Sequence, residues 1–208
     1  KEHIRRKYNA HKFIAYFQNY TNTFLPVSEF RQYMTEAGGV SGLAGIAVST
    51  RPDCIRREYL DVLREISIGK KLDITVELGL QTVNYRTLAR IGRGHGLAEF
   101  IDAVLMIREY GFGICAHVIL NLPGDGMPDC VETARFLSAL RVSTVKIHSL
   151  YIAKNTRLCE DYENGTISLC SKDEYIQRLI AFLENLDPGI AVERLFSRIP
   201  KKDAVFSN

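Results

Sequence analysis

The sequence lacks the features that mark several classes of protein. No apolar run approaches the roughly 18–20 residues of a membrane span, and no secretory signal peptide is recognisable. The 27 basic and 24 acidic residues leave a net charge of +3, which is too small to indicate nucleic-acid binding and does not exclude it. The chain begins with lysine rather than methionine, so we expect it to lie inside a longer protein.

Metal-ligand spacing is also absent from the cysteines. The five are Cys54, Cys115, Cys130, Cys159 and Cys170, and none belongs to a CxxC or CxxxCxxC cluster. Their odd number and wide spacing fit reduced thiols of a cytoplasmic protein, and we interpret each as a small buried hydrophobic residue. We therefore expect no metal ligands among the residues of this chain.

What is present is a regular alternation of strand and helix patterns. The predicted strands are 12–18, 42–50, 73–80, 113–122 and 144–152, with an edge strand at 190–196. The predicted helices are 27–37, 54–66, 84–91, 97–110, 129–140 and 171–186. Strands recur about every 30–40 residues, which is the length of a strand plus a crossover helix.

Strands joined by helices are most simply parallel, with right-handed crossovers. The nearly continuous apolar strands are typical of sheets that helices cover. We favour an α/β fold in the form of a partial, open TIM-type barrel over a flat, doubly wound sheet. Residues 1–10 look like the end of a helix, so we expect the first strand to be missing.

One domain is expected over residues 1–208, because nothing in the composition divides the chain. Its strands and helices would occupy 12–186, followed by an extension at 187–208. The connection 153–170 should be irregular, and the tail from Pro200 should be frayed.

Each predicted strand ends in polar or turn-forming residues. These ends read FQNYTNTF (17–24), VSTRPDC (48–54), ELGLQT (77–82), AHVILNLPGDG (116–126) and KIHSLYIAKN (146–155). Parallel α/β folds bind ligands where the carboxyl ends of their strands meet. The sequence therefore predicts a ligand site at this edge.

Four of these motifs, in this order, resemble those of one enzyme family. They are FQNYTNTFL (17–25), STRPD (49–53), ELGLQT with RIGRGH (77–95) and AHVILNLPGDG (116–126). The chain resembles the radical S-adenosylmethionine enzymes, in the branch of the oxygen-independent coproporphyrinogen oxidase-like proteins, the Elongator catalytic subunit and related bacterial oxidoreductases. The resemblance covers about residues 12–155.

This resemblance implies a cytoplasmic oxidoreductase that binds S-adenosylmethionine and a 4Fe-4S cluster. Such enzymes cleave S-adenosylmethionine to a 5′-deoxyadenosyl radical, which abstracts hydrogen from a substrate. The resemblance implies an electron donor such as flavodoxin or ferredoxin, and it implies no membrane association. The family's CxxxCxxC loop is absent here, so the cluster ligands are expected in a missing amino-terminal segment. The chain by itself should be inactive, and its substrate and catalytic residues are not indicated.

The resemblance also implies residue roles. Gln81 would hydrogen-bond the ribose hydroxyls, and Arg93 would pair with the methionine carboxylate. His117 lies where relatives carry an acid for the ribose or the substrate. Asn121 and Pro123 would belong to the wall beside the adenine. Further cofactor-binding candidates are Gln18, Tyr20, Ser49, Arg51, Glu77 and His148.

Other readings of the same residues stay open. Glu77 could form a structural ion pair with Arg51 or Lys146. Arg93 and His95 could simply cap a helix. The protein could be a non-radical barrel enzyme that uses Lys146 as a Schiff base, or a nucleotide-binding module without chemistry.

Overall fold

The structure is a computed structural model that describes residues 2–19, 21–196 and 204–207. The helices are α1 (Glu2–Tyr8), α2 (Val27–Gly38), α3 (Arg57–Lys70), α4 (Tyr85–Arg90), α5 (Leu97–Glu109), α6 (Met127–Ala139), α7 (Arg157–Glu163) and α8 (Lys172–Asn185). The strands are β1 (Phe13–Phe17), β2 (Leu43–Thr50), β3 (Asp73–Gln81), β4 (Gly113–Ile119), β5 (Thr144–His148), β6 (Tyr151–Ala153), β7 (Ala191–Arg194) and β8 (Ala204–Ser207). Short 3₁₀ helices are η1 (Asn22–Phe24) and η2 (Pro52–Cys54).

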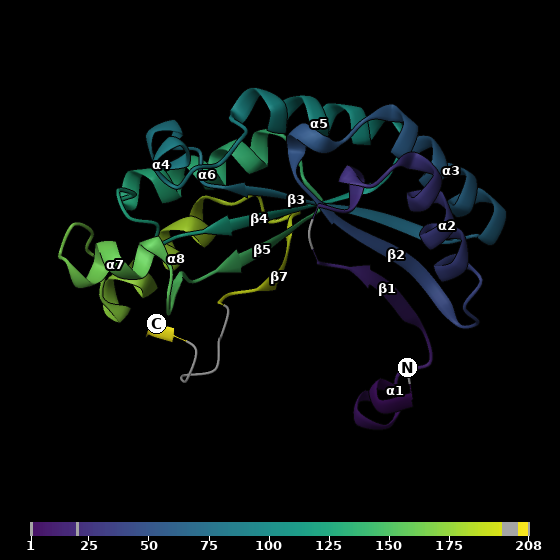
Figure 1. Cartoon of the computed structure of the whole chain (residues 1–208), viewed down its shortest axis with the longest axis horizontal. Helices are drawn as coiled ribbons and strands as arrows, with labels where there is room; N and C mark the ends of the chain where they lie inside the picture. Colours follow the sequence, from purple (N-terminus) through teal and green to yellow (C-terminus); the bar gives the residue numbers. More distant parts are fainter. Residues whose placement is uncertain (1, 20, 197–203, 208) are drawn as a thin grey trace. The chain divides into compact units, whose positions relative to one another are not determined.

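The described strands form two sheets. One has six strands in the order β1-β2-β3-β4-β5-β7, and the other pairs β6 with β8. The pairs β1–β2, β2–β3 and β5–β7 are parallel, and helices separate most successive strands along the chain (Figure 1). This confirms the predicted α/β fold of the partial TIM-barrel type.

Several predicted boundaries were wrong. The fourth strand ends at Ile119 rather than at residue 122, and the stretch 144–152 divides into β5 and β6. The helix expected from residue 54 begins at Arg57, because Pro52 opens the turn η2 first. The connection 153–170, expected to be irregular, contains α7.

The tail from Pro200 was expected to be frayed. Residues 197–203 and 208 lie outside the described residues, but Ala204–Ser207 form β8, which pairs antiparallel with β6. The expectation was therefore wrong for this strand. The edge strand after α8 is confirmed as β7, and the amino-terminal helix end is confirmed as α1.

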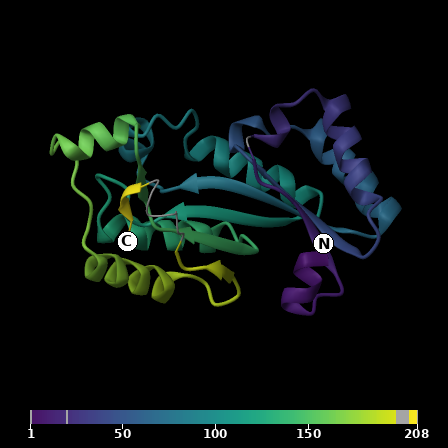
Figure 2. The same cartoon turned by 60° about the horizontal axis from the view of Figure 1, so that its bottom comes forward.

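The chain divides into two compact units. Unit 1 comprises Lys1–Gly79 and Ala98–Cys115, and unit 2 comprises Leu80–Leu97 and Ala116–Asn208. In unit 1, α2 and α3 lie side by side (Figure 1). Helix α1 has no buried residue and lies beside the start of β1 (Figure 1, Figure 2), where the Arg5 guanidinium lies 5.9 Å from the centroid of the Phe13 ring.

The core of unit 1 centres on two aromatic rings. Phe30 of α2 and Tyr59 of α3 are both fully buried and meet edge to face, with ring centroids 5.2 Å apart. The Tyr59 hydroxyl donates to the carbonyl of Leu25 at 2.7 Å, so the one polar atom of this contact is satisfied. This contact fixes the two helices against each other.

In unit 2, α6 packs against α8. Ser171 caps α8, because its hydroxyl accepts the backbone N–H of Glu174. The guanidinium of Arg178, on the same helix, is buried and donates to the carbonyl of Leu120 at 3.1 Å and to Glu174 at 2.6 Å. Among the described helices, none has both the length and the apolar character to cross a membrane.

Replacing two glycines of unit 1 by alanine should change the free energy of unfolding in opposite directions. A Cβ at Gly45 would lie 2.6 Å from the carbonyl oxygen of Asp73 on the paired strand. Gly45→Ala should therefore lower the free energy of unfolding by about 1–3 kcal/mol. A Cβ at Gly69, in α3, would meet nothing within 4 Å. Gly69→Ala should therefore raise the free energy of unfolding by about 0.5–1 kcal/mol, because alanine is the better helix former. Urea denaturation of both variants measures this, and equal effects would contradict the described strand register.

Candidate functional site

A cavity of about 850 Å³ lies within unit 2, at the carboxyl ends of its strands. Gln81 is the last residue of β3, and Ile119 is the last residue of β4. Helices α4 and α7 contribute further residues. The lining consists of Gln81, Arg90, Ile91, Gly92, Arg93, Ile119, Leu122, Pro123, Leu150, Arg157, Leu158, Asp161, Thr166 and Ile167.

Gln81 has an unusual backbone conformation for its residue type. Its φ is 72°, in the left-handed region that side chains other than glycine rarely adopt. Such a conformation costs on the order of 1 kcal/mol and is found preferentially where a side chain must point in a particular direction for function. The strained residue lines the cavity.

Arg93 reaches the cavity because helix α4 ends in a tight turn. The N–H of Gly92 donates to Ala89, and the N–H of Arg93 donates to Leu88, which together form a Schellman motif. Gly92 has a φ of 67°, which glycine adopts at little cost. The Arg93 Nε then donates to Nε2 of the buried His95 at 3.0 Å.

The loop after β4 supplies the apolar wall of the cavity. Leu122 and Pro123 line it, whereas Asn121 does not. Asn121 follows the strand rather than continuing it, so alternation along β4 does not set its direction. Its side-chain oxygen accepts the N–H of Leu150, which does line the cavity. Asn121 therefore holds the backbone of a lining residue in place without lining the cavity itself.

The cavity also includes residues that sequence reasoning missed. They are Arg90 on α4, and Arg157, Leu158 and Asp161 on α7. Arg90 is the first residue of the RIGRGH motif (90–95), so its position was a usable signal. Helix α7 was not expected at all, so nothing in the sequence pattern pointed to the other three residues.

The predicted candidates in unit 1 are grouped elsewhere. The Tyr16 hydroxyl donates to the buried carboxylate of Glu77 at 2.9 Å, and the Ser49 hydroxyl donates to it at 3.2 Å. Arg51 forms a two-point ion pair with Asp53. Gln18 is exposed just beyond β1, and Tyr20 lies outside the described residues.

His117 and His148 meet in unit 2. Their rings lie 5.2 Å apart between centroids, and an Arg194 nitrogen lies 2.7 Å from His148 Nε2. Neither histidine is among the residues that line the cavity. Lys146 lies 3.2 Å from the carboxylate of Glu193, an ion pair that a Schiff-base lysine would have to give up.

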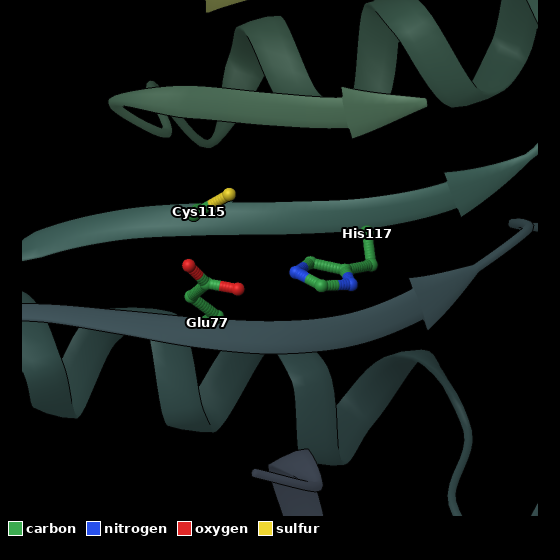
Figure 3. A group of neighbouring side chains, drawn as sticks. All are labelled: Glu77, Cys115 and His117. Atoms are coloured by element: carbon green, nitrogen blue, oxygen red, sulfur yellow. The ribbon is translucent and has the colours of Figure 1, made fainter. Parts of the chain in front are cut away.

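Strands β3 and β4 also gather three side chains of metal-ligand type. The donor atoms of Glu77, Cys115 and His117 all lie within 4.8 Å of one another. Figure 3 shows the Glu77 carboxylate and the His117 ring pointing toward each other. One carboxylate, one thiol and one imidazole suit a single divalent ion such as zinc, whereas a four-iron cluster requires three thiolates. Sequence reasoning treated Cys115 as a hydrophobic residue, although its two-residue spacing from His117 was visible.

Burial shifts the pKa of two groups behind the cavity wall. Desolvation raises the pKa of the Asp125 carboxyl, and hydrogen bonds from Thr87 and Thr82 partly oppose the shift. Desolvation also raises the pKa of the Cys130 thiol to about 12. A thiol with this pKa is protonated at neutral pH and is therefore a poor nucleophile.

The Asp125 shift predicts a pH dependence of stability. Because the folded pKa is raised, the folded state binds more protons than the unfolded state above about pH 4. The free energy of unfolding should therefore fall as the pH rises through the folded pKa. In Asp125→Asn this decline should be absent, so the variant gains stability relative to the native sequence as the pH rises from about 4 through the folded pKa. Urea denaturation across this range measures it, with the exposed Asp102→Asn as control. Parallel curves for the native sequence and Asp125→Asn would contradict it.

Two family models match the sequence of this chain. A Radical SAM superfamily model matches residues 2–137, and a Radical_SAM C-terminal domain model matches residues 142–208. Since the first match covers more than half of the residues, the chain belongs to the radical SAM superfamily. This is a superfamily of enzymes, whose members use S-adenosylmethionine and a 4Fe-4S cluster.

Curated relatives agree with this membership. The chain is 35% identical over 191 residues to an uncharacterised protein of Methanocaldococcus jannaschii, which covers 92% of this chain and 59% of the relative. It is 35% identical over 195 residues to the uncharacterised protein YtqA of Bacillus subtilis, and this match covers 94% of this chain and 60% of YtqA. The chain thus spans about 60% of the length of these curated relatives. It is 28% identical over 161 residues to Elongator complex protein 3 of Bos taurus, with 75% and 28% covered.

Solved structures show the same fold. The archaeal Elp3 of Methanocaldococcus infernus, with an amino-terminal deletion, superposes with a TM-score of 0.83 at 15% identity, covering 98% of this chain and 53% of that one. Coproporphyrinogen III oxidase of Escherichia coli superposes with a TM-score of 0.63 at 19% identity. The superposition covers 82% of this chain and 40% of the oxidase chain.

Proposed function

We propose that this chain is the core domain of a cytoplasmic, oxidoreductase-type radical S-adenosylmethionine enzyme, and that the unit 2 cavity binds S-adenosylmethionine. The supporting observation is that Gln81, Arg93 and Pro123, which the family resemblance assigns to this cofactor, line one cavity. Its volume of about 850 Å³ lies within the range of small-ligand sites.

The lining suits three parts of S-adenosylmethionine. The Arg93 guanidinium can hold the methionine carboxylate through two parallel hydrogen bonds. The Gln81 amide offers a donor and an acceptor to the ribose hydroxyls. Leu122 and Pro123 offer an apolar wall for the adenine ring. Together with a reduced iron–sulfur cluster, bound S-adenosylmethionine would supply hydrogen-abstracting chemistry that ordinary side chains cannot supply, and the residues of this chain would bind and orient it.

The same fit does not extend to the iron–sulfur cluster. The five cysteines lie on or beside different elements, and among the described residues no three thiols come within ligating distance of one another. Burial raises the pKa of Cys54, Cys130, Cys159 and Cys170, which disfavours the thiolate that iron requires. No cluster ligand is therefore assigned to this chain. A one-electron donor such as flavodoxin or ferredoxin belongs to the proposal for the whole enzyme.

The cofactor assignment predicts the effect of removing one guanidinium. Arg93→Ala should weaken the binding of S-adenosylmethionine by about 1.5–3 kcal/mol, because a charge-assisted hydrogen bond to the carboxylate is lost. Isothermal titration calorimetry measures the change. Arg86→Ala is the matched control, since Arg86 lies on the helix that leads to Arg93, is exposed, and does not line the cavity. Equal affinities in Arg93→Ala and the native sequence would mean that Arg93 only caps the helix and orders His95.

A second prediction concerns the cluster. After anaerobic reconstitution with iron and sulfide, the 208-residue chain should lack the broad visible absorption of a four-iron cluster at one per chain, because its thiols lie on or beside different elements. Iron and sulfide analysis of the desalted protein provides the measurement. A stoichiometric cluster that disappears in Cys115→Ser would show that this chain supplies ligands after all.

A further inference from the structure

We propose that Arg90 and Arg157 form a second oxyanion subsite in the unit 2 cavity, which binds the carboxylate or phosphate group of a small, partly apolar substrate. This inference rests on the proposed function and extends it, since it names the chemical class of the molecule that would share the cavity with S-adenosylmethionine. Both arginines line the cavity, one from α4 and one from α7.

The two guanidiniums differ from most arginines of the chain. Neither Arg90 nor Arg157 has a hydrogen-bond or ion-pair partner within residues 2–19, 21–196 and 204–207. A guanidinium carries five N–H donors in a fixed, planar arrangement that matches an oxyanion. Six other arginines form ion pairs with carboxylates: Arg6, Arg31, Arg51, Arg57, Arg64 and Arg178. Two unpaired guanidiniums in one cavity therefore leave a recognition surface for an anion.

Arg90 lies directly against the loop that follows β4. A Cβ on Gly124 would come within 2.8 Å of the Arg90 Nη1 and 3.4 Å of the Thr87 hydroxyl. Gly124 has a φ of 98°, a conformation that excludes most other residues. The glycine therefore leaves the space that the Arg90 guanidinium occupies beside Pro123. This packing keeps Arg90 at the cavity even though much of its side chain is exposed.

The charge balance of the cavity calls for an anion beyond the cofactor. Its lining contains three arginines and one aspartate, Asp161, which is an excess of two positive charges. S-adenosylmethionine does not neutralise this excess, because its single carboxylate is outnumbered by its ammonium and sulfonium groups. With Arg93 assigned to that carboxylate, Arg90 and Arg157 remain available to attract a negatively charged group of another molecule.

The remaining lining indicates what kind of molecule carries this anion. Leu150, Leu158 and Ile167 are apolar and share the cavity with Arg157. A small acid with an apolar body would bury that body against these side chains while its oxyanion meets the guanidiniums. A nucleic acid fits less well, because the whole chain has a net charge of only +3. The geometry thus favours a small amphipathic acid.

Titration calorimetry with simple acids tests the subsite in the 208-residue chain. Octanoate and octyl phosphate carry the two possible oxyanions, and 1-octanol is the matched neutral probe. The unmodified chain should bind at least one acid more tightly than the alcohol. The double variant Arg90→Gln/Arg157→Gln should bind that acid roughly tenfold more weakly, or weaker still, than the unmodified chain. Arg86→Gln on the same helix should bind like the unmodified chain. Which acid binds distinguishes a carboxylate from a phosphate substrate.

A parallel titration with S-adenosylmethionine separates this inference from the proposed function. Retention of cofactor binding in the double variant, together with loss of the acid, supports the subsite. Acid binding that survives in the double variant, or that never exceeds binding of the alcohol, overturns it. Binding of a short oligonucleotide that the double variant loses, without binding of either acid, also overturns it. Failure of the unmodified chain to bind S-adenosylmethionine, with the acid result intact, overturns the proposed function and leaves the subsite.

Discussion

The parallel direction of the strands is the constraint on which the candidate site depends. β1, β2 and β3 pair in parallel, as do β5 and β7, so the carboxyl ends of neighbouring strands open at one edge of each group. Segments that follow these strands then meet although they are distant in sequence. In unit 2 this brings Gln81, Pro123 and Leu150 to a single cavity. Ligand-binding residues can therefore occupy short loops while the strands provide the framework.

Much of this arrangement could be predicted from the sequence, because its signals are local. Apolar strands bounded by turn residues identified β1, β2, β3 and β4, and the period of strand and helix identified the parallel fold. The end of α4 was equally readable, since a glycine after a short helix is the residue that a Schellman motif requires. Gly92 fixes the direction of the chain at that point, and Arg93 follows it into the cavity.

The parts that failed depend on contacts that no local pattern encodes. β6 has only three residues and acquires its strand character by pairing with β8, about fifty positions later. The resemblance assigned Asn121 to the wall beside the adenine, but Asn121 follows the end of β4 at Ile119 and does not line the cavity. Helix α7 lies in a stretch without clear periodicity, so Arg157 and Asp161 could not be placed. Short elements of this kind owe their structure to tertiary packing rather than to propensity.

The arginines of unit 2 show why residue type alone does not reveal a site. Arg178 is buried, and the fold supplies acceptors for two of its nitrogens, the Leu120 carbonyl and the Glu174 carboxylate, whereas its Nε has no acceptor among the described residues. Arg93 is half-buried and is positioned through His95. Arg157 is exposed on a cavity wall, where water can satisfy its donors until a ligand replaces that water at lower dielectric. The same side chain thus has a structural role in one place and is available to a ligand in another, and the difference is set by burial and by which acceptors the fold has already supplied.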